Sequence, residues 1–246
     1  MKTVVIIQAR YSSTRLPGKV LMPINKVPLL AHVIDRCKLI ENADEVCCAI
    51  PIGYENDPLV EIAKEKRVQY FRGSELDVLS RYYHAARKFY ADNILRVTSD
   101  CPLIQPDICD KVIQNLYSIK NGISANNFSK TYPHGLDCEA FSFDVLERAY
   151  IHSTSSYDRE HVTPWIRKNK EIPKVNLSSE NTKLANLRLT IDFKEDLEFV
   201  NELFIRVGSN SSLSLEKVED ILKREPELSK INQMHNEKSR PIEQIL

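Results

Sequence analysis

Short apolar-rich runs alternate along this chain with segments whose apolar residues recur every three or four positions. The first four runs have the length of single strands and lie at 4–7, 45–51, 68–71 and 93–97. Between the first two, the helical period is carried by Leu30, Val33, Ile34 and Cys37. Nearly continuous apolar strands are typical of parallel sheets that are covered on both faces. The pattern therefore predicts an α/β domain built around a parallel sheet.

The remaining pattern continues this order towards the end of the chain. Asp57 and Pro58 are expected to open a helix, with Asp57 as its N-cap and Pro58 at its first position. The further elements predicted are helices from about Asp77, at 106–117, from Glu195 and from Leu213, and strands at 123–127 and 187–192. The tail 235–246 shows no recognisable chemistry, and no repeat or low-complexity linker interrupts the chain, so we expect one domain over residues 1–246.

The end of the first strand changes abruptly from apolar to cationic. Arg10, Arg15 and Lys19 fall within one loop, directly after that strand. In open α/β sheets, ligands bind beside the carboxyl ends of the strands, and three cations there suit a polyanion such as a nucleoside triphosphate. Simple solvation is the alternative for any one of the three. Neither a Walker A loop nor a Rossmann glycine fingerprint is present.

Carboxylates supply the second group of candidates, and each has an ordinary structural explanation. Asp100 follows the strand at 93–97 and faces the same crevice, where it is either a Mg²⁺ ligand or a turn residue bonded to its own backbone. Asp77 is either a helix cap or a ligand. Asp137 and Glu139 are two residues apart in a predicted strand, so we expect them to share one face, where two carboxylates are costly unless they are solvated, paired or functional.

Charge and cysteine content narrow the class of protein. Lysine plus arginine and aspartate plus glutamate both number 34, so the net charge is zero, which argues against nonspecific nucleic-acid binding. No apolar segment reaches the length of a membrane-spanning helix, and the first apolar run breaks at Gln8 and Arg10, unlike a signal peptide. The six cysteines form no Cys-x-x-Cys pair, which predicts neither zinc nor disulfides. We expect a cytoplasmic protein.

Several dense motifs resemble those of one enzyme family. Gln-Ala-Arg-x-x-Ser-Thr-Arg-Leu-Pro-Gly-Lys at 8–19 is similar to the opening motif of the SpsF-type cytidylyltransferases, which are related to the CMP-KDO and CMP-sialic acid synthetases. The resemblance runs from Val4 to about Asn232. The further motifs that carry it, in chain order, are Phe-Arg-Gly-Ser at 71–74, Asp-Cys-Pro-Leu-Ile at 100–104, Tyr-Pro-x-Gly-Leu-Asp-x-Glu at 132–139, Arg-Glu-His-Val-Thr-Pro at 159–164 and Leu-Arg-Leu-Thr-Ile-Asp at 187–192. Phe193-Lys194 departs from the usual Thr-Pro.

The resemblance implies both a fold and a reaction. The fold would be a three-layer, Rossmann-like nucleotide-diphospho-sugar transferase fold, α/β with a mostly parallel central sheet. Residues 120–185 would contribute a smaller lobe for acceptor binding and dimerisation, and the protein would be a homodimer. The reaction would transfer CMP from CTP to an acidic sugar or a phosphorylated acceptor, releasing pyrophosphate, in surface polysaccharide or glycan biosynthesis. A nucleotide-sugar-dependent glycosyltransferase with a related fold, and a catalytically silent nucleotide-binding subunit, are the alternatives.

The same resemblance implies roles for individual residues. The catalytic cations would be Arg10, Arg15 and Lys19. The nucleotide would contact Gln8, Ala9, Arg10, Ser13, Lys19, Arg72, Ser74, Asp77 and Ser99. The Mg²⁺ cofactor would be held by Asp100 and Asp192. The anionic acceptor would meet His134, Asp137, Glu139, Arg159 and His161, although Arg159 could instead form an ordinary ion pair with Glu160. No nucleic-acid or membrane partner is expected.

Overall fold

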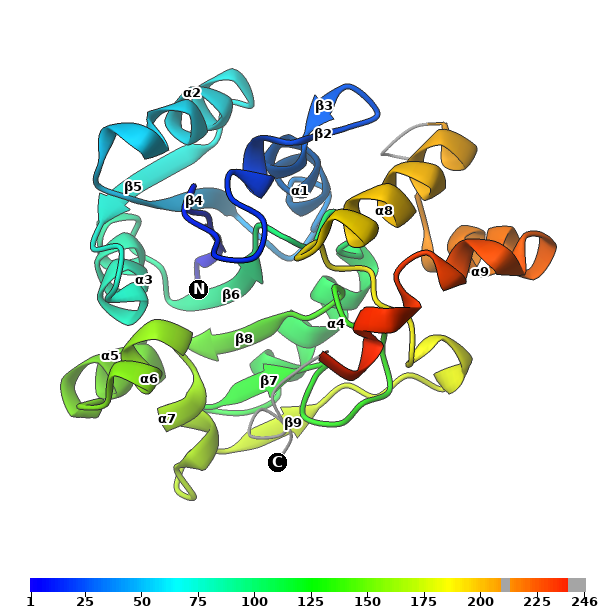
Figure 1. The fold of residues 1–246 in the computed structure, drawn as a ribbon. Coiled ribbons are helices and arrows are strands. Elements are labelled where there is room, and N and C mark those ends of the chain that lie inside the picture. The colour runs from blue at the N-terminus through cyan, green and yellow to red at the C-terminus, as the bar shows by residue number, and fades with distance from the viewer. Residues whose placement is uncertain (209–212, 239–246) are drawn as a thin grey trace.

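Strands and helices alternate through most of the chain in the computed structural model, which describes residues 1–208 and 213–238 (Figure 1). The strands are β1 (Thr3–Gln8), β2 (Pro23–Ile24), β3 (Val27–Pro28), β4 (Glu45–Pro51), β5 (Gln69–Gly73), β6 (Asn93–Thr98), β7 (Ile123–Ala125), β8 (Glu139–Ser142) and β9 (Lys174–Asn176). The helices are α1 (Leu29–Cys37), α2 (Asp57–Glu65), α3 (Val78–Lys88), α4 (Pro106–Tyr117), α5 (Phe143–His152), α6 (Ser156–His161), α7 (Pro164–Lys168), α8 (Lys194–Val207) and α9 (Leu215–Arg224). Figure 1 shows α8 and α9 beside each other, far from α5, α6 and α7.

Seven of the strands form one sheet in the order β5-β4-β1-β6-β8-β7-β9. Only β8 runs against its neighbours, because it pairs antiparallel with β6 and with β7, while the remaining pairs in the sheet are parallel. The predicted α/β class and the mostly parallel sheet are therefore confirmed. The short strands β2 and β3 form a separate antiparallel ribbon.

The alternation of side chains along the strands divides the core into two layers. Val5 and Ile7 of β1 point into one layer, which α1, α2, α4, α8 and α9 cover. Val4 and Ile6 point into the other, which α3, α5 and α7 cover. All four side chains are fully buried, as the continuous apolar run predicted. The result is the expected three-layer arrangement of helices on both faces of a sheet.

The strand order creates a ligand-binding position at the centre of the sheet. The chain passes from β1 outwards to β4 and β5, and then returns to β6 on the opposite side of β1. In open α/β sheets, such a change of direction leaves a crevice outside the carboxyl ends of the two central strands. The loops after β1 and β6 meet there, and they carry Arg10 and Asp100 respectively.

Two local predictions are wrong. The segment 187–192 is not a strand: it forms one isolated bridge, between His134 and Arg188, and its other backbone contacts go to loops, as when Ile191 N donates to Asp100 O at 2.9 Å. Its alternating apolar residues still enter the core, which is what produced a strand-like pattern. Helix α2 begins at Asp57, and Asn56 occupies the N-cap position that was predicted for Asp57.

Residues 120–185 supply β7, β8 and β9 to the main sheet and the three short helices α5, α6 and α7 to one of its faces. Figure 1 shows these helices grouped beside α3. The predicted strand at 123–127 is the shorter β7. Among the described residues, no helix is both long and apolar enough to cross a membrane. The part of the predicted tail from residue 239 onwards lies outside the described residues.

Candidate active site

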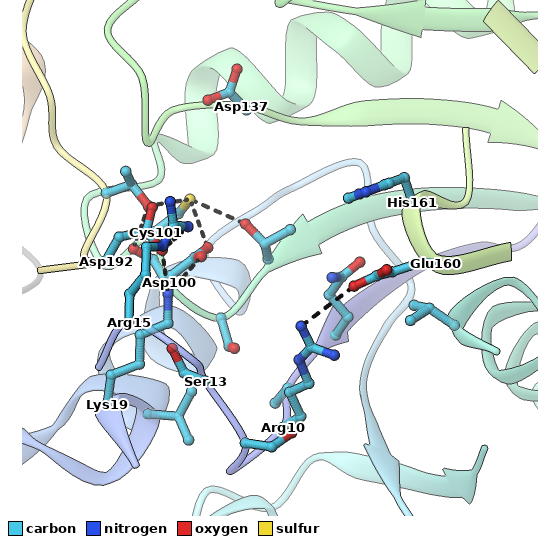
Figure 2. Close-up of a pocket in the computed structure, with 18 of the residues that line it drawn as sticks. Arg10, Ser13, Arg15, Lys19, Asp100, Cys101, Asp137, Glu160, His161 and Asp192 are labelled. Atoms are coloured by element: carbon cyan, nitrogen blue, oxygen red, sulfur yellow. Dashed lines mark hydrogen bonds and ion pairs between the residues drawn. The ribbon is translucent and has the colours of Figure 1, made fainter. Parts of the chain in front are cut away.

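A cleft with a volume of about 670 Å³ opens at the carboxyl ends of β1 and β6 (Figure 2). Such a volume is within the usual range for small-molecule sites. The predicted site residues that line it are Gln8, Ala9, Arg10, Ser13, Arg15, Lys19, Ser99, Asp100, His134, Asp137, His161 and Asp192. Two separate runs of sequence, the loop after β1 and the segment before α8, thus meet at one site.

The loop after β1 is folded back on itself so that its cations face the cleft. Gly18 adopts φ +69°, a left-handed conformation that glycine adopts without strain, and its N–H donates to the carbonyl of Tyr11 at 3.1 Å. The N–H of Tyr11 in turn donates to Oδ1 of Asn56. Lys19 follows the turn directly and begins a short 3-10 helix. The Leu-Pro-Gly-Lys sequence therefore delivers Lys19 into the interior.

Lys19 lies at the centre of the charged cluster and is only 8% exposed. Its Nζ donates to Oδ2 of Asp100 at 3.0 Å, to Oδ1 of Asp192 at 2.8 Å and to the carbonyl of Ile191 at 2.7 Å. Burial alone would lower the pKa of Lys19, but the two carboxylates outweigh it and raise that pKa. Burial opposes ionisation of Asp100 too, yet Lys19 holds the pKa of that carboxyl well below its ordinary range. Lys19 and Asp100 are therefore both charged at neutral pH.

The other two predicted cations extend the positive charge along the cleft. Arg15 pairs with Oδ1 of Asp192 at 2.8 Å and stacks over the ring of Phe193 at 5.3 Å. Arg10 lies further along and approaches Oε1 of Glu160 at 3.7 Å, as the dashed line in Figure 2 marks. Because Arg10 and Arg15 are each nearly half exposed, both can move to meet a ligand. All three predicted cations thus line the same cleft.

The wall opposite Lys19 carries hydrogen-bonding groups of mixed charge. Asp137, Glu160 and His161 form it, and Asn127 and His134 also line the cleft. Burial lowers the pKa of His161, and the nearby Arg96 and Arg10 lower it further, although Glu160 opposes them. His161 is therefore a neutral hydrogen-bonding group at pH 7 rather than a cation. Figure 2 shows Asp137 and His161 apart from the lysine cluster, across the cleft.

Asp100 and Asp192 fit a divalent cation. Their oxygens converge on one ammonium group, Nζ of Lys19, so the structure already places two carboxylates around a positive charge. Two carboxylates together with phosphate oxygens are the ligand set that Mg²⁺ prefers beside a nucleotide. Among the described residues no group of three or more His, Cys, Asp or Glu side chains is placed to hold a metal alone. A metal here would therefore depend on oxygens from the nucleotide.

Three of the residues expected at the nucleotide lie outside the lining of the cleft. Arg72 points back to its own edge of the sheet, where it donates to the carbonyls of Pro51 and Gly53 and pairs with Asp57. Asp77 caps α3 by accepting from Ser80 N at 2.8 Å, and Ser74 Oγ accepts from Asp77 N at 3.0 Å. The cap predicted for Asp77 is therefore present, and none of these three residues lines the cleft.

Two of the five residues expected at the acceptor are also held elsewhere. Arg159 forms an ion pair with Asp77 and donates to the carbonyl of Tyr150. The ion pair with Glu160 that was its predicted alternative is wrong, because Glu160 approaches Arg10 instead. Glu139 begins β8, whereas Asp137 precedes it, and the two carboxylates do not share the expected face. Glu139 is 1% exposed and pairs with Arg96 and Arg167 at 2.7 and 2.6 Å. It is a buried structural ion, not a group lining the cleft.

The buried Glu139 cluster makes stability depend on pH. Burial alone would raise the pKa of Glu139, but Arg167 and Arg96 outweigh it and hold that pKa below its ordinary value of 4.5. A carboxyl whose pKa is lower in the folded than in the unfolded state stabilises the fold at any pH above its unfolded-state pKa. This stabilisation is lost as the pH falls through its folded-state pKa. We predict that Glu139→Gln destabilises the protein by about 3–5 kcal/mol at pH 7, because it leaves two buried guanidinium groups without their carboxylate.

Urea unfolding at several pH values checks this prediction. The difference in unfolding free energy between wild type and Glu139→Gln should shrink as the pH falls below about 4.5. Glu227→Gln is the control, because its exposed pair with Lys230 contributes at most about 1 kcal/mol. A difference that stays constant down to about pH 3 would show that folding does not lower the pKa of Glu139.

Sequence reasoning missed several residues of the cleft, of which Arg81 and Arg96 are the most informative. Both are largely buried, and the Nε of each has no hydrogen-bond partner among the described residues, as is also true of Oε1 of Gln8. Burial lowers the pKa of Arg81 to about 10. Unpartnered buried polar atoms are rare in proteins, and the three atoms named here belong to residues that line the cleft. For Arg81 and Arg96, the one signal in the sequence is a cation in an otherwise apolar helix face or strand.

The chain is similar to known proteins over nearly its whole length. The profile of the cytidylyltransferase family matches residues 4–236. An uncharacterized protein of Methanocaldococcus jannaschii is 35% identical over 241 residues, which cover 97% of this chain and 98% of that protein. The spore coat polysaccharide biosynthesis protein SpsF of Bacillus subtilis is 29% identical over 229 residues, covering 90% and 94%. A shorter match, 36% over 125 residues, is to the 3-deoxy-manno-octulosonate cytidylyltransferase of Aeromonas salmonicida and covers 47% and 46%.

Solved structures give the same result. A cytidylyltransferase from Leptospira borgpetersenii superposes with a TM-score of 0.88 and 32% sequence identity, covering 93% of this chain and 96% of that one. The resemblance to SpsF-type cytidylyltransferases that the motifs indicated is thereby confirmed over nearly the whole described chain.

Proposed function

This chain belongs to the cytidylyltransferase family, and we propose that it transfers CMP from CTP to an anionic sugar or phosphorylated sugar acceptor and releases pyrophosphate. One observation carries the proposal beyond the family. A single cleft brings Arg10, Arg15 and Lys19 together with two carboxylates, at the carboxyl ends of the central strands. Cations for a triphosphate and ligands for its metal thus occupy one site.

This reaction depends mainly on how the protein positions the reactants and stabilises the charge that develops on them. An acceptor oxygen attacks the α-phosphorus of CTP, the bond from that phosphorus to the β-phosphate oxygen breaks, and pyrophosphate leaves. Lys19 and Arg15 lie where they can offset the charge that develops on the leaving group, and Arg10 extends this surface. Mg²⁺, held by Asp100 and Asp192 with phosphate oxygens, would neutralise charge on the phosphates and orient them. No general base is assigned.

The unpartnered polar atoms favour binding of the nucleoside near β1 and α3. Gln8 Oε1 and Arg81 Nε are an acceptor and a donor that lack protein partners among the described residues, and both residues line the cleft. Cytosine carries both a carbonyl acceptor and an amino donor, so it can satisfy both kinds of atom. We assign Gln8, Ala9, Ser13, Ser99 and Arg81 to nucleotide binding on this basis.

The opposite wall suits an acceptor that carries both an acidic group and hydroxyls. Arg10 and Arg96 offer positive charge, while Asn127, His134 and Asp137 offer hydrogen-bonding groups for a polyol. One relative is named for spore coat polysaccharide biosynthesis, and we propose polysaccharide biosynthesis as the setting here. Membership in a nucleotidyltransferase family disfavours the glycosyltransferase alternative, which would consume a sugar nucleotide and release no pyrophosphate.

Pyrophosphate release tests the proposed function. The protein is incubated with Mg²⁺ and each of the four nucleoside triphosphates, against a panel of acidic sugars and sugar phosphates. We expect release with CTP, only when an acceptor is present, and little or none with ATP, GTP or UTP. Thermal protection by each triphosphate and by sugar nucleotides is measured in parallel. Protection by a sugar nucleotide but not by CTP, without any pyrophosphate release, would contradict the proposal.

A further inference from the structure

Arg188 lies directly behind the cleft, and its side chain has no exposed surface. Its Nη2 donates to Oδ2 of Asp192 at 2.7 Å, and its Nε donates to both carboxylate oxygens of Asp196, at 2.9 and 3.1 Å. Its Nη1 lies 3.3 Å from Nδ1 of His134. One guanidinium group therefore joins a carboxylate of the lysine cluster to a histidine that also lines the cleft.

This arrangement divides the two oxygens of Asp192 between the interior and the cleft. Oδ2 is held from behind by Arg188, whereas Oδ1 receives Lys19 and Arg15, each at 2.8 Å. A carboxylate held at one oxygen cannot rotate freely, so the other oxygen keeps its direction into the cleft. Residues that bond to a metal ligand from behind in this way orient it and tune its affinity.

Asp192 needs such support because its segment is not part of the sheet. Residues 187–192 form one isolated bridge among the described residues, so no ladder of backbone bonds fixes them. The carboxylate of Asp196 replaces the ladder: its Oδ2 accepts from the N–H groups of Asp192 and Phe193 at 2.9 and 3.0 Å. The buried ion pair of Arg188 with Asp196 is the fixed point to which Asp192 is attached.

A segment far along the chain completes the network. Asn232 is 2% exposed, and its Nδ2 donates both to Oδ1 of Asp196 and to the carbonyl of Arg188, each at 2.9 Å. Asn232 therefore holds the buried ion pair on the side away from the cleft. The network contains no exposed charge, so its hydrogen bonds are not exchanged for bonds to water.

The contact with His134 also fixes the state of that ring. The nitrogens of a guanidinium group only donate, so Nδ1 of His134 accepts, and in the neutral imidazole the proton lies on Nε2. Nε2 faces Oδ2 of Asp137 at 3.9 Å. Arg188 thereby selects which ring nitrogen is presented to the acceptor side of the cleft.

We propose that Arg188 is a positioning residue that orients Asp192 for the metal-bound nucleotide and His134 for the acceptor through one guanidinium group. This inference rests on the proposed function, which gives Asp192 and His134 their ligands. Lysine cannot replace arginine here, because a single ammonium group cannot reach two carboxylates and a histidine in the directions of a planar fork. The reaction then depends on a residue that touches neither substrate.

Arg188→Lys tests the inference, with Arg206→Lys as the matched control. Arg206 also bridges two carboxylates, Glu202 and Glu225, but on the exposed side of α8 and outside the lining of the cleft. Binding of Mn²⁺ is measured by electron paramagnetic resonance with and without CTP, which requires no turnover. The Mg²⁺ concentration that gives half-maximal turnover and the KM for the acceptor are measured as well.

For Arg188→Lys we expect the dissociation constant for Mn²⁺ and the half-saturating Mg²⁺ concentration to rise about 10–100-fold. Excess Mg²⁺ should restore much of kcat, whereas the acceptor KM should remain raised, because metal cannot replace the contact with His134. Arg206→Lys should leave all of these values unchanged. A merely structural role of Arg188 would lower thermal stability without a response to Mg²⁺.

A folded Arg188→Lys protein with wild-type Mn²⁺ binding and acceptor KM would overturn the inference. If that variant does not fold, Asn232→Ala perturbs the same network more gently, and we expect an increase of about 3–10-fold in the dissociation constant for Mn²⁺. An unchanged value would again contradict the inference. A wild-type protein that releases no pyrophosphate with any triphosphate contradicts the proposed function instead, while Mn²⁺ binding still decides the role of Arg188.

Discussion

Asp100→Asn is expected to lower kcat for CMP transfer about 10²–10³-fold, while the protein remains folded. Asparagine keeps the size of the side chain and one carbonyl oxygen, but it removes one of the two negative charges that converge on Lys19. The side chain of Asp100 is about a quarter exposed, so the loss of its charge leaves no buried carboxylate behind. Lys19, the buried cation that it pairs with, keeps its second ion pair, with Asp192. The loss therefore falls on the reaction rather than on stability.

Steady-state pyrophosphate release at saturating CTP and Mg²⁺ measures this effect. Asp107→Asn is the matched control: it follows the same strand, lies in the first turn of α4 and is exposed, so its kcat should be unchanged. Thermal unfolding shows whether both variants fold. A value of kcat for Asp100→Asn close to that of Asp107→Asn would remove Asp100 from the proposed metal site.

Lys19→Met is expected to reduce kcat about 10³-fold and to raise the KM for CTP. Methionine preserves the apolar stem that is buried in the loop after β1 but removes the ammonium group that bonds to Asp100, Asp192 and Ile191 O. The phosphates lose a positive charge, and the two carboxylates lose the cation that holds them together. Both changes raise the barrier for departure of pyrophosphate.

Lys19→Arg and Lys64→Met serve as controls for this variant. Arginine keeps the charge but presents it as a planar fork, so we expect partial activity from Lys19→Arg. Lys64 pairs with Glu61 on the exposed side of α2, and its replacement by methionine should change neither kcat nor KM. Turnover by Lys19→Met within about tenfold of wild type would mean that Lys19 organises the fold rather than the reaction.

The central charged cluster could be predicted because its members mark the ends of recognisable elements. Lys19 follows a buried strand and a glycine turn, and Asp100 follows a second buried strand, so the topology of a parallel sheet alone brings them to one edge. Asp192 lies at the same cleft, although the strand predicted at 187–192 does not form. The apolar alternation before it reports burial of Leu189 and Ile191, and the bonds of Asp192 to Arg188 and Asp196 hold its carboxylate at the cleft.

The residues that were misplaced are those whose partners lie far away in the sequence. Asp77 and Arg159 pair across 82 positions, and neither local pattern indicates the other. Glu139 looked like an acceptor ligand because a buried carboxylate needs a reason, but that reason is its ion pairs with Arg96 and Arg167. The support of Asp192 by Arg188 and Asn232 was equally hidden, since Asn232 has no motif around it that suggests a role.

The fate of the α-phosphate shows most directly whether CMP is transferred from CTP to the acceptor. The protein is incubated with Mg²⁺, the acceptor panel and CTP that carries ³²P either at the α or at the γ position, and the products are separated by charge. The account predicts that the α label appears in a sugar-linked product, while the γ label leaves entirely as pyrophosphate. Transfer of the γ label to the acceptor, or recovery of both labels in unreacted CTP with every acceptor of the panel, would contradict it.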